Sequence, residues 1–250
     1  MNWAQSGSVV SEWVAGRIPV LECLRAAKRR PHKLYLLEDA KNVEQIVRAA
    51  NEIPIQKCTR HELNRMLPDA LHQGVILEAD PLPIWDLRDW LLRPRSQQAI
   101  LVALDEITDP HNFGAIARSA AACGAEAVLY CQRHAAPVTP VGLKSAAGAM
   151  EYIDLVSVPN MMRALKTLKN AGFWIIALDA AANKTLWDAD LTGKITLVVG
   201  SEGKGIRPLV RHACDDAVRI PIAGPITSLN ASVSAGIALA ECLRQRLIHK

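Results

Sequence analysis

From residue 98 to the C-terminus, short apolar runs alternate with segments of helical spacing, and this alternation constrains the fold more than any other feature of the 250-residue chain. The runs are apolar without interruption, which is typical of strands covered by helices on both faces of a parallel sheet. The pattern therefore predicts an α/β domain. We expect strands at 99–104, 127–130, 153–156, 174–178, 196–199 and 217–220, and helices at 112–123, 142–149, 161–171, 207–213 and 229–247.

The front of the chain predicts a second, smaller α/β unit, because apolar runs and helical spacing alternate there as well. We expect a small domain at 1–80, a proline-containing linker at 81–97 and the larger domain at 98–250. The expected elements of the small domain are helices at 18–27, 43–50 and 61–67 and strands at 33–37, 53–55 and 74–77, the strand at 53–55 lying at a sheet edge.

Composition narrows the class of protein. No apolar stretch reaches the ~18 residues that a membrane span needs, and the N-terminus lacks the pattern of a secretory signal. The six cysteines show no C-x-x-C spacing, so we expect reduced core thiols without a disulfide framework or a bound metal. We therefore expect a cytoplasmic protein that does not enter a membrane.

The net charge of +4 is small, but its distribution is uneven. Basic residues cluster within residues 17–33, where Glu22 is the acidic residue. Such a cluster is typical of a solvated helix end, and it is also the electrostatic pattern that phosphate binding requires. The candidate phosphate contacts are Arg17, Arg25, Lys28, Arg29 and Arg30.

The first of three notable turns in the larger domain spans residues 109–118. Pro110 cannot continue a strand ladder, so a turn is expected there, with Asn112 as the cap of the following helix. Arg118 falls inside that helix among small residues, which would allow a large group to approach closely. A capped helix with a surface arginine would give the same pattern.

The second turn spans residues 200–205 and is rich in glycine, which permits positive φ or close approach of a ligand to the backbone. It matches neither the P-loop spacing nor the G-x-G-x-x-G pattern of dinucleotide-binding proteins. Glu202 is placed to orient a hydroxyl or an amine. Any α/β protein has glycine turns at strand ends, so this turn alone defines no function.

The third turn opens the final expected helix. Ser228 is a candidate cap, Asn230 follows two residues later, and residues 231–236 carry almost no side-chain bulk. Small residues here are typical of close helix–sheet packing. They would also allow a second subunit to approach the helix.

Taken together, the three turns resemble the signature motifs of the SpoU (TrmH-type) RNA 2′-O-ribose methyltransferases. The resemblance covers residues 100–247. Residues 12–79 resemble the substrate-binding domain that often precedes the catalytic domain in this family, mainly at 16–22 and 72–75. Within the family, the chain is most similar to the bacterial 23S rRNA guanosine-2′-O-methyltransferases.

The resemblance implies a parallel sheet with a C-terminal trefoil knot of the SPOUT type, an exception to the rule that chains do not thread loops. It also implies S-adenosyl-L-methionine as cofactor, RNA as substrate, and a homodimer with the helix at 229–247 in or near the interface. The implied catalytic residues are Asn112, Arg118, Glu202, Ser228 and Asn230, and the implied cofactor-contacting residues are Gly200, Ile220 and Leu229.

In the family the arginine is proposed as the base, which conflicts with a guanidinium that stays protonated in proteins. We expect Arg118 instead to clamp a phosphate or to stabilise the developing alkoxide, with Glu202 orienting Arg118 or the nucleoside. Three alternatives stay open: a tRNA 2′-O-methyltransferase of the same family, a non-catalytic RNA-binding ribosome-assembly factor, and a nucleotide-dependent α/β enzyme.

Overall fold

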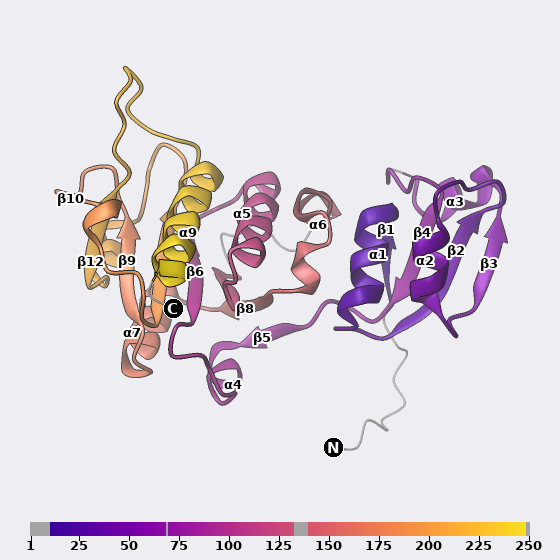
Figure 1. Ribbon diagram of the computed structural model, residues 1–250, viewed down its shortest axis with the longest axis horizontal. Coiled ribbons are helices and arrows are strands. Elements are labelled where there is room, and N and C mark those ends of the chain that lie inside the picture. The colour runs from indigo at the N-terminus through magenta and orange to yellow at the C-terminus, as the bar shows by residue number, and fades with distance from the viewer. Residues whose placement is uncertain (1–10, 69, 133–139, 249–250) are drawn as a thin grey trace. The chain divides into compact units, whose positions relative to one another are not determined.

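The computed structural model describes residues 11–68, 70–132 and 140–248. The chain divides into two compact units, Met1–Pro83 and Ile84–Lys250, which are drawn in Figure 1 and described separately below.

The first unit is built on a four-stranded sheet with the order β1-β4-β2-β3. β4 is antiparallel to both of its neighbours, and β2 and β3 are parallel. The strands are β1 (Glu12–Ala15), β2 (Pro31–Leu37), β3 (Ile55–Cys58) and β4 (Val75–Ala79), and the helices are α1 (Arg17–Ala26), α2 (Glu44–Ala50) and α3 (Arg60–Met66).

Side chains along β2 alternate between the two faces of this sheet, as a period of two residues requires. Leu34 and Leu36 join the core under α1 and α2, whereas Tyr35 and Leu37 pack with Leu63 of α3. The sheet is therefore covered on both faces. β3 lies at the edge, as expected, but it begins at Ile55 and not at residue 53, and β1 was not expected from the sequence at all.

The second unit confirms the α/β prediction. Its eight strands follow the order β10-β12-β9-β11-β6-β7-β8-β5, and every neighbouring pair is parallel. The strands are β5 (Ile84–Asp86), β6 (Ile100–Asp105), β7 (Ala127–Cys131), β8 (Asp154–Val158), β9 (Trp174–Leu178), β10 (Lys184–Thr185), β11 (Ile195–Gly200) and β12 (Asp216–Arg219).

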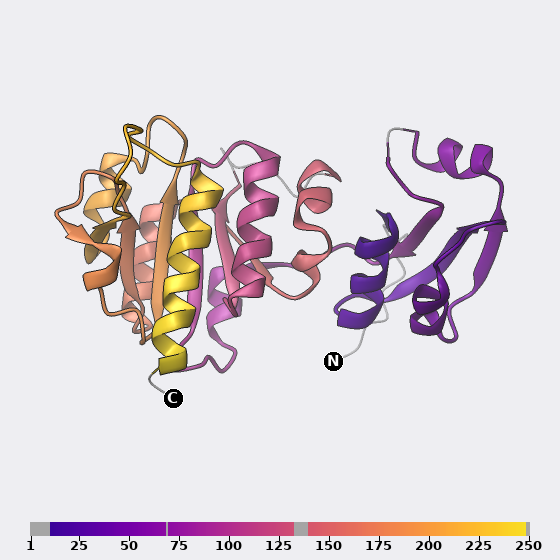
Figure 2. The ribbon, with the colours of Figure 1, turned by 45° about the horizontal axis from the view of Figure 1, so that its top comes forward.

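Helices cover both faces of this sheet, as Figure 2 shows. α5 (Pro110–Ala122) packs against α6 (Pro140–Ala146) and α9 (Ala231–Ile248) on one face. On the other face, α4 (Leu87–Leu91), α7 (Met161–Asn170) and α8 (Pro208–His212) contribute to a core with the strands. Short 3-10 helices lie at Ala149–Glu151 and Leu186–Asp188.

Residues 84–91 fall inside the segment expected as a linker, but they belong to the second unit. β5 pairs with β8, and Trp90 in α4 is fully buried. The Trp90 Nε1–H donates to Asp154 Oδ2 at 3.0 Å, and the Arg95 guanidinium lies 3.6 Å from the ring centroid of Trp90. The burial of this tryptophan explains why a proline-bounded segment adopts regular structure.

All six cysteines are free, and Cys23, Cys58 and Cys242 are buried. Burial raises the pKa of Cys214 and of Cys242 to about 12, so both side chains are protonated thiols at neutral pH. Cys123, Cys131 and Cys214 are only partly buried, so the structure places three of the six cysteines in the core. Within the described ranges, no helix combines the length and the apolar character that crossing a membrane would take.

Candidate active site

The three turns singled out in the sequence lie at one edge of the parallel sheet. β6, β11 and β12 all run in the same direction, and Gly200 at the end of β11 is in register with Asp105 at the end of β6. The loops that follow these strands lead into α5, α8 and α9. Because carboxyl ends of parallel strands meet at one edge, segments about 90 and 118 residues apart are brought together there.

One polar side chain from each turn joins a hydrogen-bonded cluster. Asn112 Nδ2 donates to Glu202 Oε1 at 3.0 Å, and Asn230 Nδ2 donates to Asn112 Oδ1 at 3.0 Å. Asn230 Nδ2 also lies against Glu202 Oε1. We call these three side chains the polar cluster. Glu202 thus accepts from two amides, whereas we had expected it to orient Arg118 or a nucleoside.

Asn112 does not cap its helix, which corrects the expectation. α5 begins at Pro110, and Asp109 is the cap, accepting from His111 N at 2.9 Å. Proline favours the first helical position because its missing N–H is not needed there. Asn112 therefore lies within the first turn with its side chain directed to Glu202.

A second cap was also assigned to the wrong residue. α9 begins at Ala231, and Asn230 caps it, accepting through Oδ1 from the backbone N–H groups of Ser232 at 2.9 Å and Val233 at 3.3 Å. Asn230 therefore has two functions: its carbonyl oxygen fixes the helix start, and its amide nitrogen donates into the polar cluster. Ser228 lies in the exposed loop before the helix.

A cavity of about 670 Å³ lies at the same sheet edge. The three residues expected at the cofactor, Gly200, Ile220 and Leu229, all line it, and so do Glu202, Ser228 and Asn230. Residues at the end of β9, among them Leu178, also line it and were not foreseen. β9 is the neighbour of β11 in the sheet, an order that the sequence does not reveal.

The loop at residues 201–205 folds back tightly. Ser201 and Gly205 exchange two backbone hydrogen bonds of 3.1 and 2.9 Å, and Gly203 and Gly205 have φ of +80° and +67°. A Cβ on Gly200 would lie only 2.2 Å from the carbonyl carbon of Gly205 and 2.4 Å from Ile206 N. Gly200 is therefore needed for this loop to close beside the cavity.

An ion pair between a buried carboxylate and a partly exposed arginine anchors the same loop, and the sequence motifs do not contain it. Asp105 is fully buried, and it accepts from Arg207 N at 2.9 Å, Nε at 2.9 Å and Nη2 at 2.6 Å. The hydrogen bond to Asp105 raises the pKa of Arg207. The pair joins the end of β6 to the residue that follows the loop. The sequence does contain one indication of this pair: Asp105 ends an otherwise apolar strand, and a buried charge needs a partner.

Arg118 is not part of the polar cluster in this chain. It is exposed, and no hydrogen bond or ion pair joins it to another described residue. It follows Asn112 by six residues, which places it about 9 Å along the helix and roughly two thirds of a turn around it. The two side chains therefore leave α5 in different directions.

The small residues near Arg118 have a structural partner. A Cβ on Gly114 would lie 2.4 Å from the carbonyl oxygen of Gly142 and 2.6 Å from Ser145 Cβ, so α6 of the same chain occupies the space beside α5. The large group for which these small residues leave room is thus a neighbouring helix.

Small residues of α9 also pack within the chain. Ala235 and Ala238 are fully buried, and a Cβ on Gly236 would lie 3.6 Å from Ser119 Oγ of α5. The opposite side of α9 carries a stripe of exposed apolar side chains, which we call the α9 stripe. It contains Val233, Ala240, Leu243 and Leu247.

The basic residues expected to contact RNA have different surroundings. Only 2% of the Arg29 side chain is exposed, and its Nη1 bonds to Glu12 Oε2 at 3.0 Å and to the carbonyl oxygen of Asp80 at 3.3 Å. Arg29 ties the first unit together and is not available to RNA, which corrects that expectation. Arg25 pairs with Glu22 at 3.2 Å, Lys28 is half-buried and Arg30 is exposed.

Across the described ranges, no group of three or more histidine, cysteine, aspartate or glutamate side chains could hold a metal ion.

Comparison with known proteins defines the class of molecule. Residues 99–240 match the model of the SpoU rRNA Methylase family, and residues 13–85 match the RNA 2′-O ribose methyltransferase substrate-binding domain. The chain belongs to the SpoU rRNA methylase family, and it is therefore an RNA methyltransferase by family.

Particular relatives agree with this membership. An uncharacterized tRNA/rRNA methyltransferase of Mycolicibacterium vanbaalenii is 44% identical over 94% of this chain and 77% of its own length. The SpoU methyltransferase AviRb of Streptomyces viridochromogenes is similar in structure, with a TM-score of 0.82 and 26% identity over 96% of this chain and 91% of AviRb. AviRb in complex with the cofactor AdoMet gives a TM-score of 0.78.

Proposed function

We propose that this chain transfers a methyl group from S-adenosylmethionine to the ribose 2′-hydroxyl of a guanosine in 23S rRNA. The observation that carries the proposal is the convergence of Asn112, Glu202 and Asn230, one from each motif, at the sheet edge that holds the cavity. A polar cluster beside a cavity lined partly by backbone is suited to binding a small cofactor and orienting a hydroxyl next to it.

The cavity fits S-adenosylmethionine, which is the cofactor of this enzyme family. Its volume lies within the usual range for small-molecule sites, roughly 300–1,000 Å³. Gly200, which has no Cβ, lets the loop at residues 201–205 close beside the cavity, and Ile220 and Leu229 offer apolar walls. These residues would hold the cofactor, which when bound supplies an electrophilic methyl group.

The chain's own residues then orient the ribose and stabilise the charge that develops on its 2′-oxygen. Glu202 holds the amides of Asn112 and Asn230 in fixed directions, and Ser228 lies beside them on the loop before α9. Arg118 stabilises the negative charge that develops on the ribose oxygen or clamps an adjacent phosphate, because a guanidinium is a planar, permanently charged donor. Most of the rate gain can come from such positioning.

The separation of Arg118 from the polar cluster supports a homodimer. Val233, Leu243 and Leu247 of the α9 stripe are 49%, 36% and 59% exposed, and an exposed apolar stripe on a helix is typical of a protein interface. A second copy on this stripe would bury it. In that dimer, Arg118 of one copy serves the polar cluster of the other.

The dimer is tested by light scattering of the wild type and of Leu243→Glu at micromolar concentration. We expect a dimer for the wild type and a monomer for the variant, with Glu44→Gln in the first unit as an unaffected control. Ala235 is unsuitable for this test because it is buried inside the chain. A monomeric wild type would rule out the shared site.

The substrate-binding match at residues 13–85 and the rRNA methylase match at residues 99–240 support an rRNA substrate. We place the reaction in the cytoplasm, where ribosomal RNA is processed. The division of labour between a substrate-binding first unit and a catalytic second unit is part of the proposal. The trefoil knot of the family also stays a prediction, which tracing the backbone of an experimental structure would check.

The direct test offers S-adenosylmethionine with unmodified transcripts of bacterial 23S rRNA and of bacterial tRNA, followed by mapping of 2′-O-methyl groups. We expect one guanosine of the 23S transcript to be methylated. Methylation of tRNA alone would assign the enzyme to the tRNA branch of the family. RNA binding without methylation of either transcript would favour a ribosome-assembly factor that has lost its chemistry.

A further inference from the structure

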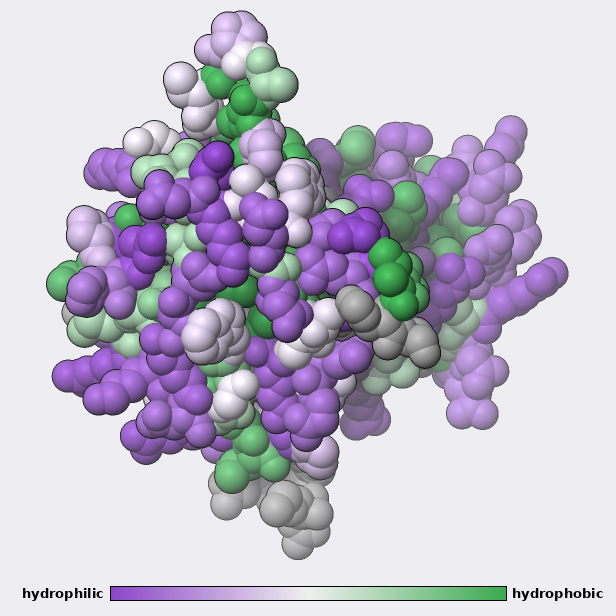
Figure 3. Space-filling model, turned by 60° about the vertical axis from the view of Figure 1, so that its left-hand side comes forward, coloured by the Kyte–Doolittle hydropathy of each residue, from purple (hydrophilic) through white to green (hydrophobic). Residues whose placement is uncertain are grey.

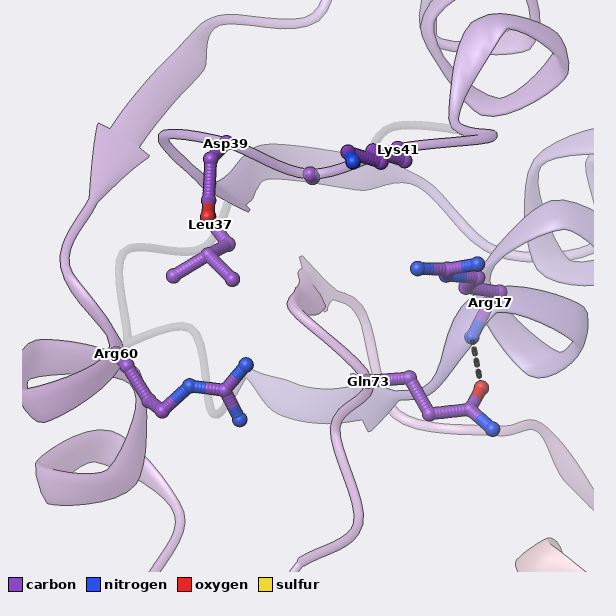
Figure 4. A pocket seen from close by; sticks show the side chains of 7 residues that line it. Arg17, Leu37, Asp39, Lys41, Arg60 and Gln73 are labelled. Atoms are coloured by element: carbon purple, nitrogen blue, oxygen red, sulfur yellow. Dashed lines mark hydrogen bonds between the residues drawn. The ribbon is translucent and has the colours of Figure 1, made fainter.

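The first unit contains a cavity of about 480 Å³ that the sequence did not reveal, shown in Figure 4. Three basic side chains, Arg17, Lys41 and Arg60, line it together with the carboxylate of Asp39 and the amide of Gln73. We call it the basic pocket. All its lining residues belong to the unit that matches the RNA substrate-binding domain, and no comparison assigns a role to any of them.

Segments far apart in sequence build the basic pocket. Arg17 is the first residue of α1, Lys41 lies in the loop after β2, and Arg60 is the first residue of α3, which Thr59 separates from β3. β2 and β3 are parallel neighbours, so the loops that follow them leave the sheet at the same edge. Three basic side chains, separated by 24 and 19 residues, therefore meet at one place.

Hydrogen bonds hold one wall of the basic pocket in place. The side chain of Gln73 accepts from Arg17 N at 3.1 Å, as the dashed line in Figure 4 marks. Gln73 and Gly74 both have positive φ, of +51° and +80°. His72 stabilises this turn, because its Nδ1 accepts from Gly74 N at 3.0 Å while its Nε2 bonds to Asn64 Oδ1 at 2.8 Å. The turn is thus preformed.

The charges of the basic pocket favour an anion. Three cations face one carboxylate, and within the described residues the Nε of Arg17 is buried without a hydrogen-bond partner. A buried donor of this kind costs free energy until an acceptor reaches it. Phosphate oxygens are the acceptors that arginine forks bind best. In the basic run at residues 25–30, by contrast, Arg29 is buried against Glu12 and Arg25 is paired with Glu22.

We propose that the basic pocket holds the phosphodiester backbone of the RNA substrate, with Arg17, Lys41 and Arg60 contacting phosphates. The proposal rests on the proposed RNA methyltransferase function. It assigns substrate binding to the basic pocket and not to the basic run at residues 25–30. The negative charge of Asp39 lowers the net positive charge of the basic pocket and so lowers its affinity for RNA.

The test compares two triple variants that each remove three positive charges from the first unit. The pocket variant, Arg17→Ala/Lys41→Ala/Arg60→Ala, removes the three cations of the basic pocket. The control variant, Arg25→Ala/Arg30→Ala/Arg48→Ala, removes three cations outside it. Affinity for the 23S rRNA transcript is measured by filter binding at several salt concentrations. Each lost phosphate contact lowers the slope of log affinity against log salt by about 0.7 to 0.9, so the pocket variant should lose about 2 to 3 units of slope and at least about tenfold in affinity.

Asp39→Asn provides a variant whose effect cannot come from damage to the fold. Removing this carboxylate should tighten RNA binding about two- to threefold, because a repulsive charge next to the phosphates disappears. Equal losses in both triple variants, or an unchanged slope in the pocket variant, would overturn the proposal.

Failure of the basic pocket and failure of the proposed function give different results. If the wild type methylates the transcript and the pocket variant binds it unchanged, only the pocket is wrong. If the pocket variant loses affinity while the wild type methylates nothing, RNA binding by the basic pocket is supported and the proposed methyl transfer is contradicted. Circular dichroism and thermal unfolding of each full-length variant, compared with the wild type, check that the first unit is folded.

Discussion

The site at the edge of the large sheet and the basic pocket of the small unit are built alike, yet only the first could be predicted. Both lie where loops leave parallel strands, and both collect residues from distant segments. The residues of the first site are embedded in turns that need glycine, proline or a cap, and such turns leave a local pattern. The basic pocket is made of Arg17, Lys41 and Arg60, whose types occur anywhere on a surface. Local backbone constraints are readable in a sequence, whereas the convergence of charges is not.

The strongest way to sharpen this comparison concerns Arg118, a residue that its motif predicts but that stays outside the polar cluster. Arg118→Ala should lower kcat by about 10²–10³, the usual cost of removing one donor that stabilises developing charge. Cofactor affinity should stay within about twofold, since Arg118 does not line the cavity. Arg118→Lys should be nearly as inactive, because lysine lacks the planar fork.

Single-turnover methylation and calorimetric titration with S-adenosylhomocysteine measure these two quantities. Arg163→Ala, an exposed arginine of α7 in the same unit, is the matched control and should act like the wild type. Full activity of Arg118→Ala would remove this residue from the mechanism, and high activity of Arg118→Lys would show that a point charge suffices.

A second test addresses the ion pair between Asp105 and Arg207, which the motifs did not contain. Asp105→Asn should destabilise the protein by about 2 kcal/mol, since hydrogen bonds to a charged group contribute about 1.5–3 kcal/mol and Arg207 is partly exposed to solvent. It should also weaken cofactor binding, because Arg207 anchors the loop at residues 201–205. Urea unfolding and cofactor titration measure both effects.

Glu106→Gln is the control, because Glu106 approaches the same arginine only at 3.5 Å and is partly exposed. It should change the free energy of unfolding by less than about 0.5 kcal/mol. If Asp105→Asn and Glu106→Gln behaved alike, the pair at Asp105 would not hold the loop.

A weaker effect is expected in the pH dependence of the stability of the first unit, through His72 in the turn beside the basic pocket. Burial lowers the pKa of His72 from its ordinary value of 6.5, so the folded unit favours the neutral ring. The stability due to this neutral ring is fully present above pH 6.5 and is lost as the pH falls through the lowered pKa. Protonation of Nδ1 would also break its bond from Gly74 N, worth about 1 kcal/mol.

Thermal unfolding of the wild type and of His72→Gln between pH 7.5 and 5 tests this. The melting temperature of the wild type should exceed that of the variant at pH 7.5, and the gap should narrow toward pH 5. His61 is an exposed histidine of the nearby helix α3. The difference in melting temperature between His61→Gln and the wild type should not change with pH. A gap for His72→Gln that is constant across this range would show that the ring does not titrate with folding.

Most strands could be predicted because continuous apolar runs in a parallel sheet are unambiguous; the strand expected at 174–178 is β9 (Trp174–Leu178). β10 has two residues, too few for a pattern. Both caps were misassigned because Asp109, Asn112, Ser228 and Asn230 are all good capping residues. The choice among them depends on where each helix starts, which tertiary contacts decide.

Several residues that line the cavity at the edge of the large sheet could be predicted from the turns, but the shape of this cavity could not. The loop at 220–230 projects from the second unit in Figure 1, and Figure 3 shows apolar side chains along it. Ile226 in this loop is 57% exposed, and Thr227 lines the cavity. The end of β9 joins the cavity only because of the strand order β9-β11-β6. Strand order depends on chain topology, which residue patterns do not report.

Calorimetric titration of the wild type, Gly200→Ala and Gly193→Ala with S-adenosylhomocysteine, NAD and ATP shows whether the cavity at the sheet edge binds the methyl-donor cofactor. A Cβ at Gly200 would collide with the backbone of Gly205, whereas a Cβ at Gly193 would have no heavy atom within 4 Å. We predict that the wild type and Gly193→Ala bind S-adenosylhomocysteine alike and bind neither nucleotide, and that Gly200→Ala, still folded, binds at least about tenfold more weakly, the cost of about 1.4 kcal/mol of strain. Binding of NAD or ATP as tight as that of S-adenosylhomocysteine, or unchanged binding by Gly200→Ala, would contradict the account.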